Sequence, residues 1–396
     1  MEPAYSLTIP SVEDDLTLDC RVYHPISLIN SQDSGSNALR GTVIAHPYGP
    51  LGGSYDDAVV LAAIESMLSQ GYIVATFNFR GAGQSAGRTT WTGRAETEDY
   101  VSVAGFLVYY LHYMSATNNE INTGSSRSID MVLAGYSYGS LVLAKLPPLP
   151  RTIQRFHDAA VGTSAAEVVM RAHTLAEQTY RTIQSQQDQS KSRGRSLNPG
   201  TADNLSPSKQ RARPALVTVG GEETDPSQRR SSRDSRRSMD VMRRSVDVPR
   251  KIKAHMRKHS SQASATSTSD RDTQALPMQK KNAAPVVGVR YLLISPVVVP
   301  FTTTLCPPGS PAVARTSRKG DAKGGALFLQ HPTLAIFGSS DGFTYSRTLR
   351  AWAERETKES KASNFEWKEI AGAGHFWREQ DAMSRLQERL SAWLKG

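Results

Sequence analysis

The chain has few cysteines, a low share of apolar residues and no long apolar run, and each shortage excludes a class of protein. Two cysteines among 396 residues, Cys20 and Cys306, cannot form a disulfide framework and are typical of a reducing compartment. No apolar run approaches the roughly 20 residues of a transmembrane helix. Residues 1–15 lack the basic start and apolar stretch of a secretory signal. These features predict a soluble, cytoplasmic protein.

Apolar residues make up 38% of the sequence, less than a compact globule usually contains. The shortage is concentrated in residues 184–284, which are rich in Ser, Arg, Lys and Gln and contain no aromatic residue. Such a segment cannot bury enough apolar surface to offset its ordering entropy. We therefore predict a largely disordered basic insertion over 151–285, between two parts of one domain over 1–150 and 286–396. Weak helical periodicity in residues 151–183 marks a candidate cap element.

The net charge of +10 comes from the insertion. From Arg151 to Gly288 there are 25 basic and 13 acidic residues, whereas the rest of the chain has 22 basic and 24 acidic residues. Serines follow three Arg-Arg pairs there, so Ser232, Ser238 and Ser245 are candidate sites for basophilic kinases. The alternatives are weak electrostatic attachment to an anionic membrane or to nucleic acid, and simply solvated, disordered sequence. Because the segment lacks interleaved aromatics and an amphipathic pattern, we expect no specific nucleic-acid partner and no lipid insertion.

Strand and helix patterns alternate in the two outer parts. Near-continuous apolar strands, such as Tyr72–Phe79, need cover on both faces of a sheet. The alternation therefore predicts an α/β fold with a mostly parallel sheet between two helix layers. The expected strands are 6–10, 16–23, 42–45, 72–79, 129–134, 287–300, 333–337 and 364–370, and the expected helices are 56–70, 96–114, 138–145, 343–357 and 379–395.

The pattern Gly-x-Ser-x-Gly, which places a nucleophilic serine on a sharp strand-to-helix turn, occurs three times, around Ser85, Ser137 and Ser340. No helix pattern follows Ser85. Ser340 lies between a strand and a helix, but no later carboxylate in a loop could orient the one histidine that follows it. Ser137 directly follows a buried strand, directly precedes an apolar helix, and has an acid and a base downstream. The context therefore indicates Ser137 as the nucleophile, the alternative being a small residue in a tight turn.

Serine needs a histidine to accept its proton and a carboxylate to hold that histidine. Of nine histidines, His375 alone lies in a Gly-rich turn between a late strand and the last helix, which predicts it as the base. Asp341, at the end of the preceding strand, is the predicted acid. The alternative for Asp341 is a helix N-cap, and both roles could hold together. His46, at a strand end before proline, is interpreted as structural.

The oxyanion of a tetrahedral intermediate needs backbone donors near the nucleophile. We expect one to be the amide of Tyr138, directly after Ser137. The loop after the strand at 42–45 should supply the other, which we assign to the amide of Tyr48, with Gly49 as the neighbouring candidate. No cofactor and no metal is expected, because no His, Cys or Asp cluster has ligand spacing.

These motifs together resemble small intracellular α/β-hydrolases related to dienelactone hydrolases and to the catalytic domains of Xaa-Pro dipeptidyl-peptidases (S15-like). The resemblance rests on His46-Pro47 with Gly52–Asp56, on Phe77–Ser85, on Ala95–Asp99, on the turn at Ser137 and on Gly374-His375-Phe376. The resemblance implies an α/β-hydrolase fold. It also implies that the loop around Ser85 is a structural corner of that fold. The insertion is a departure from the smaller relatives.

The resemblance implies hydrolysis of an ester, thioester or amide of a small molecule or peptide through an acyl-enzyme on Ser137. Two other functions are compatible with the same fold. The chain could transfer the acyl group to an alcohol or amine, which product analysis would reveal. It could instead be a non-catalytic scaffold acting through its basic insertion, although the presence of Ser137, Asp341 and His375 argues against this.

Overall fold

A computed structural model describes residues 1–30, 38–90, 93–119, 128–194, 218–219, 284–298, 326–360 and 364–396. These residues belong to one compact unit formed by Met1–Gly221 and Ala284–Gly396. The candidate phosphorylation sites Ser232, Ser238 and Ser245, and most of the predicted disordered insertion, lie outside the described residues.

A central sheet has the strand order β6-β1-β2-β4-β3-β5-β7-β8-β9. Strand β2 pairs antiparallel with β1 and with β4, and every pairing from β4 across to β9 is parallel. The mostly parallel sheet and its antiparallel edge are therefore confirmed. The strands are β1 (Tyr5–Pro10), β2 (Thr17–Tyr23), β3 (Ala38–Ala45), β4 (Ile73–Phe77), β5 (Ser128–Tyr136), β6 (Thr218–Val219), β7 (Val287–Ile294), β8 (Thr333–Gly338) and β9 (Phe365–Ile370).

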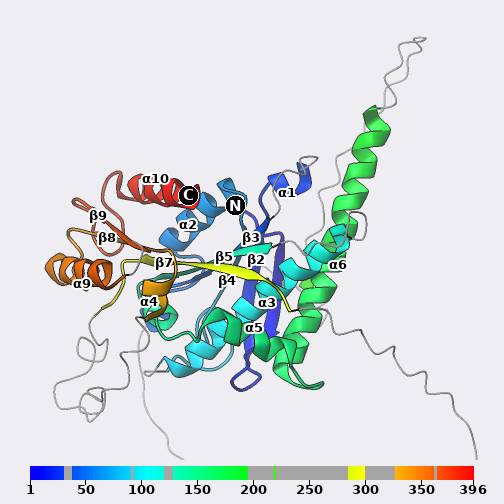
Figure 1. The fold of residues 1–396 in the computed structure, drawn as a ribbon, viewed down its shortest axis with the longest axis horizontal. Helices are drawn as coiled ribbons and strands as arrows, with labels where there is room; N and C mark the ends of the chain where they lie inside the picture. Colours follow the sequence, from blue (N-terminus) through cyan, green and yellow to red (C-terminus); the bar gives the residue numbers. More distant parts are fainter. Residues whose placement is uncertain are drawn as a thin grey trace, which may run out of the picture. The chain divides into compact units, whose positions relative to one another are not determined.

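Helices cover both faces of the sheet (Figure 1). On one face α2 (Ala58–Ser69) and α10 (Ala382–Leu394) pack through Ile64, Met67 and Leu386 against β5 and β7. On the other face α3 (Arg94–Asn119) lies across the sheet and buries Phe106, α6 (Ser164–Gly194) packs beside it against β1, and α5 (Leu149–His157) contacts both helices. The remaining helices are α1 (Ser27–Asn30), the 3-10 helix η1 (Gly49–Leu51), α4 (Tyr138–Leu143), α8 (Ala326–Gln330) and α9 (Ser346–Glu359).

The central strands are buried on both faces of the sheet, which is why they appear in the sequence as nearly continuous apolar runs. All five residues of β4 are buried, and so are the last six of β5. The strand order, the two helix layers and the turn from β5 into α4 at the centre of the sheet form an α/β-hydrolase fold, as predicted. No helix within the described residues is both long and apolar enough to cross a membrane.

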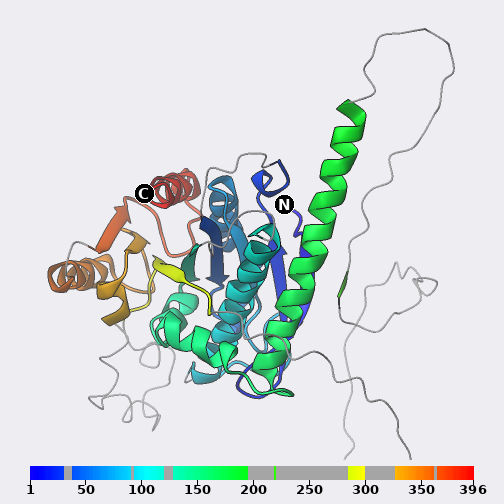
Figure 2. The same ribbon diagram turned by 45° about the vertical axis from the view of Figure 1, so that its right-hand side comes forward.

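Helix α6 differs from what the sequence predicts. Contrary to the disorder expected from residue 184, the helix continues to Gly194, and Figures 1 and 2 show it reaching past the sheet. Its first half buries Val168, Ala172 and Leu175. The Tyr110 hydroxyl lies 2.9 Å from Thr179 Oγ1. The candidate cap at 151–183 is therefore part of the helix layer on the α3 side of the sheet.

Candidate active site

Ser137 occupies the sharp turn between β5 and α4. Its backbone has φ 53° and ψ −114°, a conformation that costs a residue with a side chain on the order of 1–3 kcal/mol. The Ser137 amide donates to the Ile294 carbonyl at 2.9 Å, and the Ser137 carbonyl accepts from the Ser140 amide at 3.0 Å. These bonds connect the turn to β7 and to the first turn of α4. Such strain, held by its surroundings, is typical of a functional turn.

Two glycines make this turn possible. A Cβ on Gly135 would lie 2.4 Å from the Gly139 carbonyl carbon, and a Cβ on Gly139 would lie 2.5 Å from the Ala45 carbonyl oxygen. Both neighbours are backbone atoms, which cannot move aside as a flexible side chain can. The glycines of the motif are therefore required by close backbone packing between β5, α4 and the end of β3.

The structure brings the side chains of Ser137, His375 and Asp341 into one hydrogen-bonded line. His375 Nε2 lies 2.8 Å from Ser137 Oγ, and His375 Nδ1 lies 2.7 Å from Asp341 Oδ2. All three residues are buried. A carboxylate only accepts, so the neutral imidazole donates from Nδ1 to Asp341 and presents Nε2 as the acceptor for the serine hydroxyl. This is the arrangement that can take a proton from Ser137.

Asp341 uses its second oxygen to shape the loop after β8. Its Oδ1 accepts from the amides of Phe343 at 2.8 Å and Thr344 at 2.9 Å. The predicted helix at 343–357 consequently begins later, at Ser346, with Tyr345 at its N-cap position. The N-cap alternative for Asp341 is wrong, because Asp341 lies five residues before the first residue of the helix and its carboxylate holds the intervening turn.

The turn that carries His375 is held from β5, β7 and β8. The hydroxyl of Tyr136 donates to the His375 carbonyl at 2.9 Å. The Ser340 amide donates to the Ala373 carbonyl at 2.9 Å, and a Cβ on Gly338 would lie 2.0 Å from that carbonyl oxygen. Trp377, with φ 55°, donates from its indole to Ser295 Oγ at 3.0 Å. The histidine is therefore positioned by packing and not left to swing on a flexible loop.

The loop after β3 lies against the turn at Ser137. The contact of Gly139 with the Ala45 carbonyl brings the end of β3 to the start of α4. The rings of Tyr48 and Tyr138 meet edge to face, with centroids 5.1 Å apart. The two residues predicted to supply oxyanion donors thus lie side by side next to Ser137.

His46 holds this loop in place. Its side chain is fully buried, with Nδ1 2.5 Å from the Pro47 carbonyl and Nε2 accepting from the Phe79 amide at 2.9 Å. Burial lowers the pKa of His46 to about 4, so its imidazole is neutral at physiological pH. Both ring nitrogens are used for structure, in agreement with the interpretation from the sequence.

The serines of the other two Gly-x-Ser-x-Gly matches have different surroundings. Ser85 is buried, and its Oγ donates to the Asn78 carbonyl at 2.6 Å and accepts from the Asp19 amide at 2.9 Å. It is therefore part of the corner that follows β4. Ser340 is exposed in the turn that carries Asp341.

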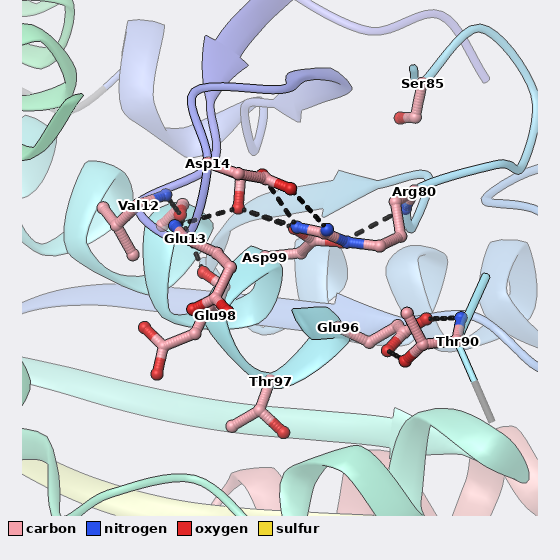
Figure 3. A network of polar contacts seen from close by, with 12 residues as sticks. Val12, Glu13, Asp14, Arg80, Ser85, Thr90, Glu96, Thr97, Glu98 and Asp99 are labelled. Atoms are coloured by element: carbon pink, nitrogen blue, oxygen red, sulfur yellow. Dashed lines mark hydrogen bonds and ion pairs between the residues drawn. The ribbon is translucent and has the colours of Figure 1, made fainter. Parts of the chain in front are cut away.

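A buried ion pair at the corner that follows β4 was not predicted from the sequence. Arg80 donates to both carboxylate oxygens of Asp99, at 2.6 and 2.9 Å, and to Asp14 at 2.9 Å. Figure 3 shows Arg80 reaching between these two acids. Ser11 Oγ donates to Asp99 at 2.7 Å. The network connects the start of α3, the loop before β2 and the corner after β4, which His46 in turn connects to the loop carrying Tyr48.

A further carboxylate lies within electrostatic range of His375. Burial raises the pKa of Asp57, the N-cap residue of α2, whereas the α2 backbone amides, Arg378 and His375 act in the opposite direction. Asp57 Oδ1 accepts from the Val59 amide at 2.8 Å.

Among the described residues, no three or more His, Cys, Asp or Glu side chains are grouped to hold a metal ion.

Comparison with known proteins connects the N-terminal part of the chain to one family. Residues 14–139 match the family model described as X-Pro dipeptidyl-peptidase (S15 family). This stretch runs from the loop before β2 to the glycine that follows Ser137 by two positions, and it ends before Asp341 and His375. No match was found among curated proteins.

Solved structures resemble the chain at low sequence identity. An α/β serine hydrolase without lid from Xanthomonas campestris is 14% identical, with TM-score 0.43 over 100% of this chain and 96% of its own. An α/β serine hydrolase homologue from Coxiella burnetii is 14% identical, with TM-score 0.41 over 99% and 98%. Est1E from Butyrivibrio proteoclasticus, solved with ferulic acid bound, is 10% identical, with TM-score 0.43 over 98% and 97%. At these TM-scores the fold assignment rests on the strand order and helix layers described above.

Proposed function

Because residues 14–139 relate this α/β-hydrolase-fold chain to the X-Pro dipeptidyl-peptidase (S15) family, we propose that it is a serine hydrolase. It cleaves an ester, thioester or amide of a small molecule or peptide through an acyl-enzyme on Ser137. The observation that carries the proposal is the hydrogen-bonded line from Ser137 Oγ through both nitrogens of His375 to Asp341.

Acylation begins when Ser137 Oγ attacks the acyl carbon while its proton moves to His375 Nε2. The Asp341 carboxylate accepts from Nδ1 and stabilises the imidazolium that forms, without itself taking the proton. The carbonyl oxygen of the substrate becomes an oxyanion, for which the amides of Tyr48 and Tyr138 are the donors in this proposal. The rings of Tyr48 and Tyr138 lie 5.1 Å apart and the end of β3 packs against the start of α4, so the loop carrying Tyr48 lies beside the turn at Ser137, which supports that assignment.

The intermediate then collapses, and the bond between the acyl carbon and the leaving oxygen, sulfur or nitrogen breaks. His375 Nε2 gives its proton to that atom, which leaves as an alcohol, thiol or amine. A water molecule next donates a proton to His375 and attacks the acyl carbon, and His375 returns the proton to Ser137 as the acid is released. Apart from the substrate and this water, the proposed cycle uses only the three side chains and the two backbone amides.

Labelling with a fluorophosphonate probe tests the proposal, because the probe reacts with an activated serine and not with an ordinary one. We expect wild type to be labelled and Ser137→Ala to remain unlabelled. Ser340→Ala is the matched control, since Ser340 is an exposed serine in the same sequence pattern, and it should label like wild type. Persistent labelling of Ser137→Ala, or none of the folded wild type, would contradict the proposal.

A further inference from the structure

Two phenylalanines lie against the imidazole of His375 and are only partly covered. The ring centroid of Phe343 is 4.5 Å from that of His375 at an interplanar angle of 31°, and the ring of Phe376 is 5.4 Å away at 86°. The two phenyl rings meet each other edge to face at 5.4 Å. Their residues are 37% and 47% exposed, so a substrate can contact them.

Both rings are positioned by the residues of the candidate triad. The Phe343 amide donates to Asp341 Oδ1 at 2.8 Å, which fixes the backbone that carries its ring. Phe376 directly follows His375, and the guanidinium of Arg378 lies over its ring at 5.2 Å. The rings therefore keep a defined place relative to His375 Nε2. Rigid aromatic groups next to the reacting atoms bind apolar partners at a low cost in conformational entropy.

The mechanism decides which half of the substrate lies near these rings. His375 Nε2 must come within hydrogen-bond reach of the leaving atom in order to protonate it. The acyl carbon bonds to Ser137 Oγ, and its oxygen faces the Tyr48 and Tyr138 amides in the proposed mechanism. Aromatic rings that contact the imidazole thus lie next to the path of the leaving group.

We propose that Phe343 and Phe376 form a leaving-group subsite that selects substrates whose alcohol or amine part is apolar and preferably aromatic. This inference rests on the proposed function, because it assumes that Ser137 is acylated. The favoured geometry is edge to face, the arrangement the two rings already adopt with each other.

A pair of isomeric esters separates the two halves of the substrate. Benzyl acetate carries its ring on the leaving group, and methyl phenylacetate carries the same ring on the acyl group. Methyl acetate, whose alcohol has an acidity similar to that of benzyl alcohol, is the reference. Esters with a common acyl group form the same acyl-enzyme, so a leaving-group preference must be measured as kcat/KM.

Phe343→Ala and Phe376→Ala should each lower kcat/KM for benzyl acetate by about three- to tenfold. The values for methyl acetate and methyl phenylacetate should stay close to those of wild type. Tyr345→Ala is the matched control, because Tyr345 is an aromatic residue of the same loop, is 78% exposed, and makes no ring contact with His375 among the described residues. It should leave all three values unchanged.

Fluorophosphonate labelling distinguishes failure of the leaving-group subsite from failure of the proposed function. The leaving group of the probe is fluoride, which is too small to contact either ring. Phe343→Ala and Phe376→Ala should therefore be labelled at the wild-type rate. A fall in labelling together with all three esters would mean that the rings only position His375. Equal falls for the two isomers, or labelling of wild type without hydrolysis of benzyl acetate, would likewise overturn the leaving-group subsite. Failure of wild type to label would overturn the proposed function itself.

Discussion

The phenolic hydroxyl of Tyr136 donates a 2.9 Å hydrogen bond to the backbone carbonyl of His375. Tyr136 is the last residue of β5 and directly precedes Ser137, so one side chain connects the turn carrying the serine to the turn carrying the histidine. The phenol is fully buried, and its ring lies 5.9 Å from the imidazole. The distance between Ser137 and His375 is therefore controlled in part by the residue before the nucleophile.

Tyr136→Phe should weaken this connection while keeping the ring. Loss of one buried hydrogen bond is expected to lower the free energy of unfolding by about 1 kcal/mol. If the same free energy is lost in the transition state, the rate of fluorophosphonate labelling falls about fivefold. Chemical denaturation and labelling kinetics measure the two effects. Unchanged labelling in Tyr136→Phe would show that the hydrogen bond does not position His375.

Asp341→Asn should separate the two roles of this side chain. The amide oxygen of asparagine can still accept from the Phe343 and Thr344 amides, so the loop after β8 should persist. The amide nitrogen cannot accept from His375 Nδ1, and the imidazole is then held in the wrong tautomer. We expect kcat for an activated ester to fall about 10⁴-fold, with little change in melting temperature. A variant within tenfold of wild type would exclude Asp341 as the acid.

Alanine substitutions at three glycines test the packing of the turn. Gly135→Ala and Gly139→Ala place a Cβ within 2.4 and 2.5 Å of backbone atoms, whereas a Cβ on Gly342 meets nothing within 4 Å. The first two should lower the free energy of unfolding by about 1–3 kcal/mol, and Gly342→Ala should change it by less than about 0.5 kcal/mol. Thermal and chemical denaturation provide the comparison. Equal effects at all three positions would contradict the close approach described here.

The buried His46 should make the fold sensitive to mild acid. Burial lowers its pKa from 6.5 to about 4. Between these two pH values the unfolded chain binds a proton at this histidine, whereas the folded chain does not. Stability from this residue is complete above pH 6.5 and is lost as the pH falls toward 4. Between pH 8 and pH 5 the loss should be about 2 kcal/mol.

Replacement of His46 by glutamine tests that pH dependence. His24 has the same lowered pKa, about 4, because of its own burial, so wild type should lose stability from both histidines. His46→Gln is expected to be less stable at pH 8 but to lose about 2 kcal/mol less on going to pH 5. Denaturant titrations at the two pH values give the difference. An unchanged pH dependence would mean that His46 is protonated in the folded state as readily as in the unfolded chain.

Local patterns in the sequence predicted most of the fold. Strands such as β4 are buried on both faces and appear as continuous apolar runs, and the expected bounds of Tyr72–Phe79 exceed the observed Ile73–Phe77 by little. Helix α6 was underestimated because its last turns are polar and its stability comes from Val168, Ala172 and Leu175 at the other end. A pattern of periodicity cannot predict how far such a helix continues.

The three residues of the candidate triad could be predicted from their order along the chain and from the strands that they follow. Ser137, Asp341 and His375 each follow a strand of the parallel sheet, and the structure brings their side chains together. Contacts between distant positions were not predictable. Arg80 lies in a visible motif, but its partners Asp14 and Asp99 are 66 and 19 residues away. The ring of Phe343 lies against His375 because Asp341 bends the chain after β8.

The mass of the protein during turnover of an activated acetate ester tests most directly whether Ser137 is the nucleophile. Acid quenching within the first turnovers, followed by peptide mapping, identifies the serine that carries the acetyl group. We expect an acetyl adduct on the peptide containing Ser137, and none on the peptides containing Ser85 or Ser340. An adduct on another residue, or hydrolysis that continues at the wild-type rate in Ser137→Ala, would contradict that expectation.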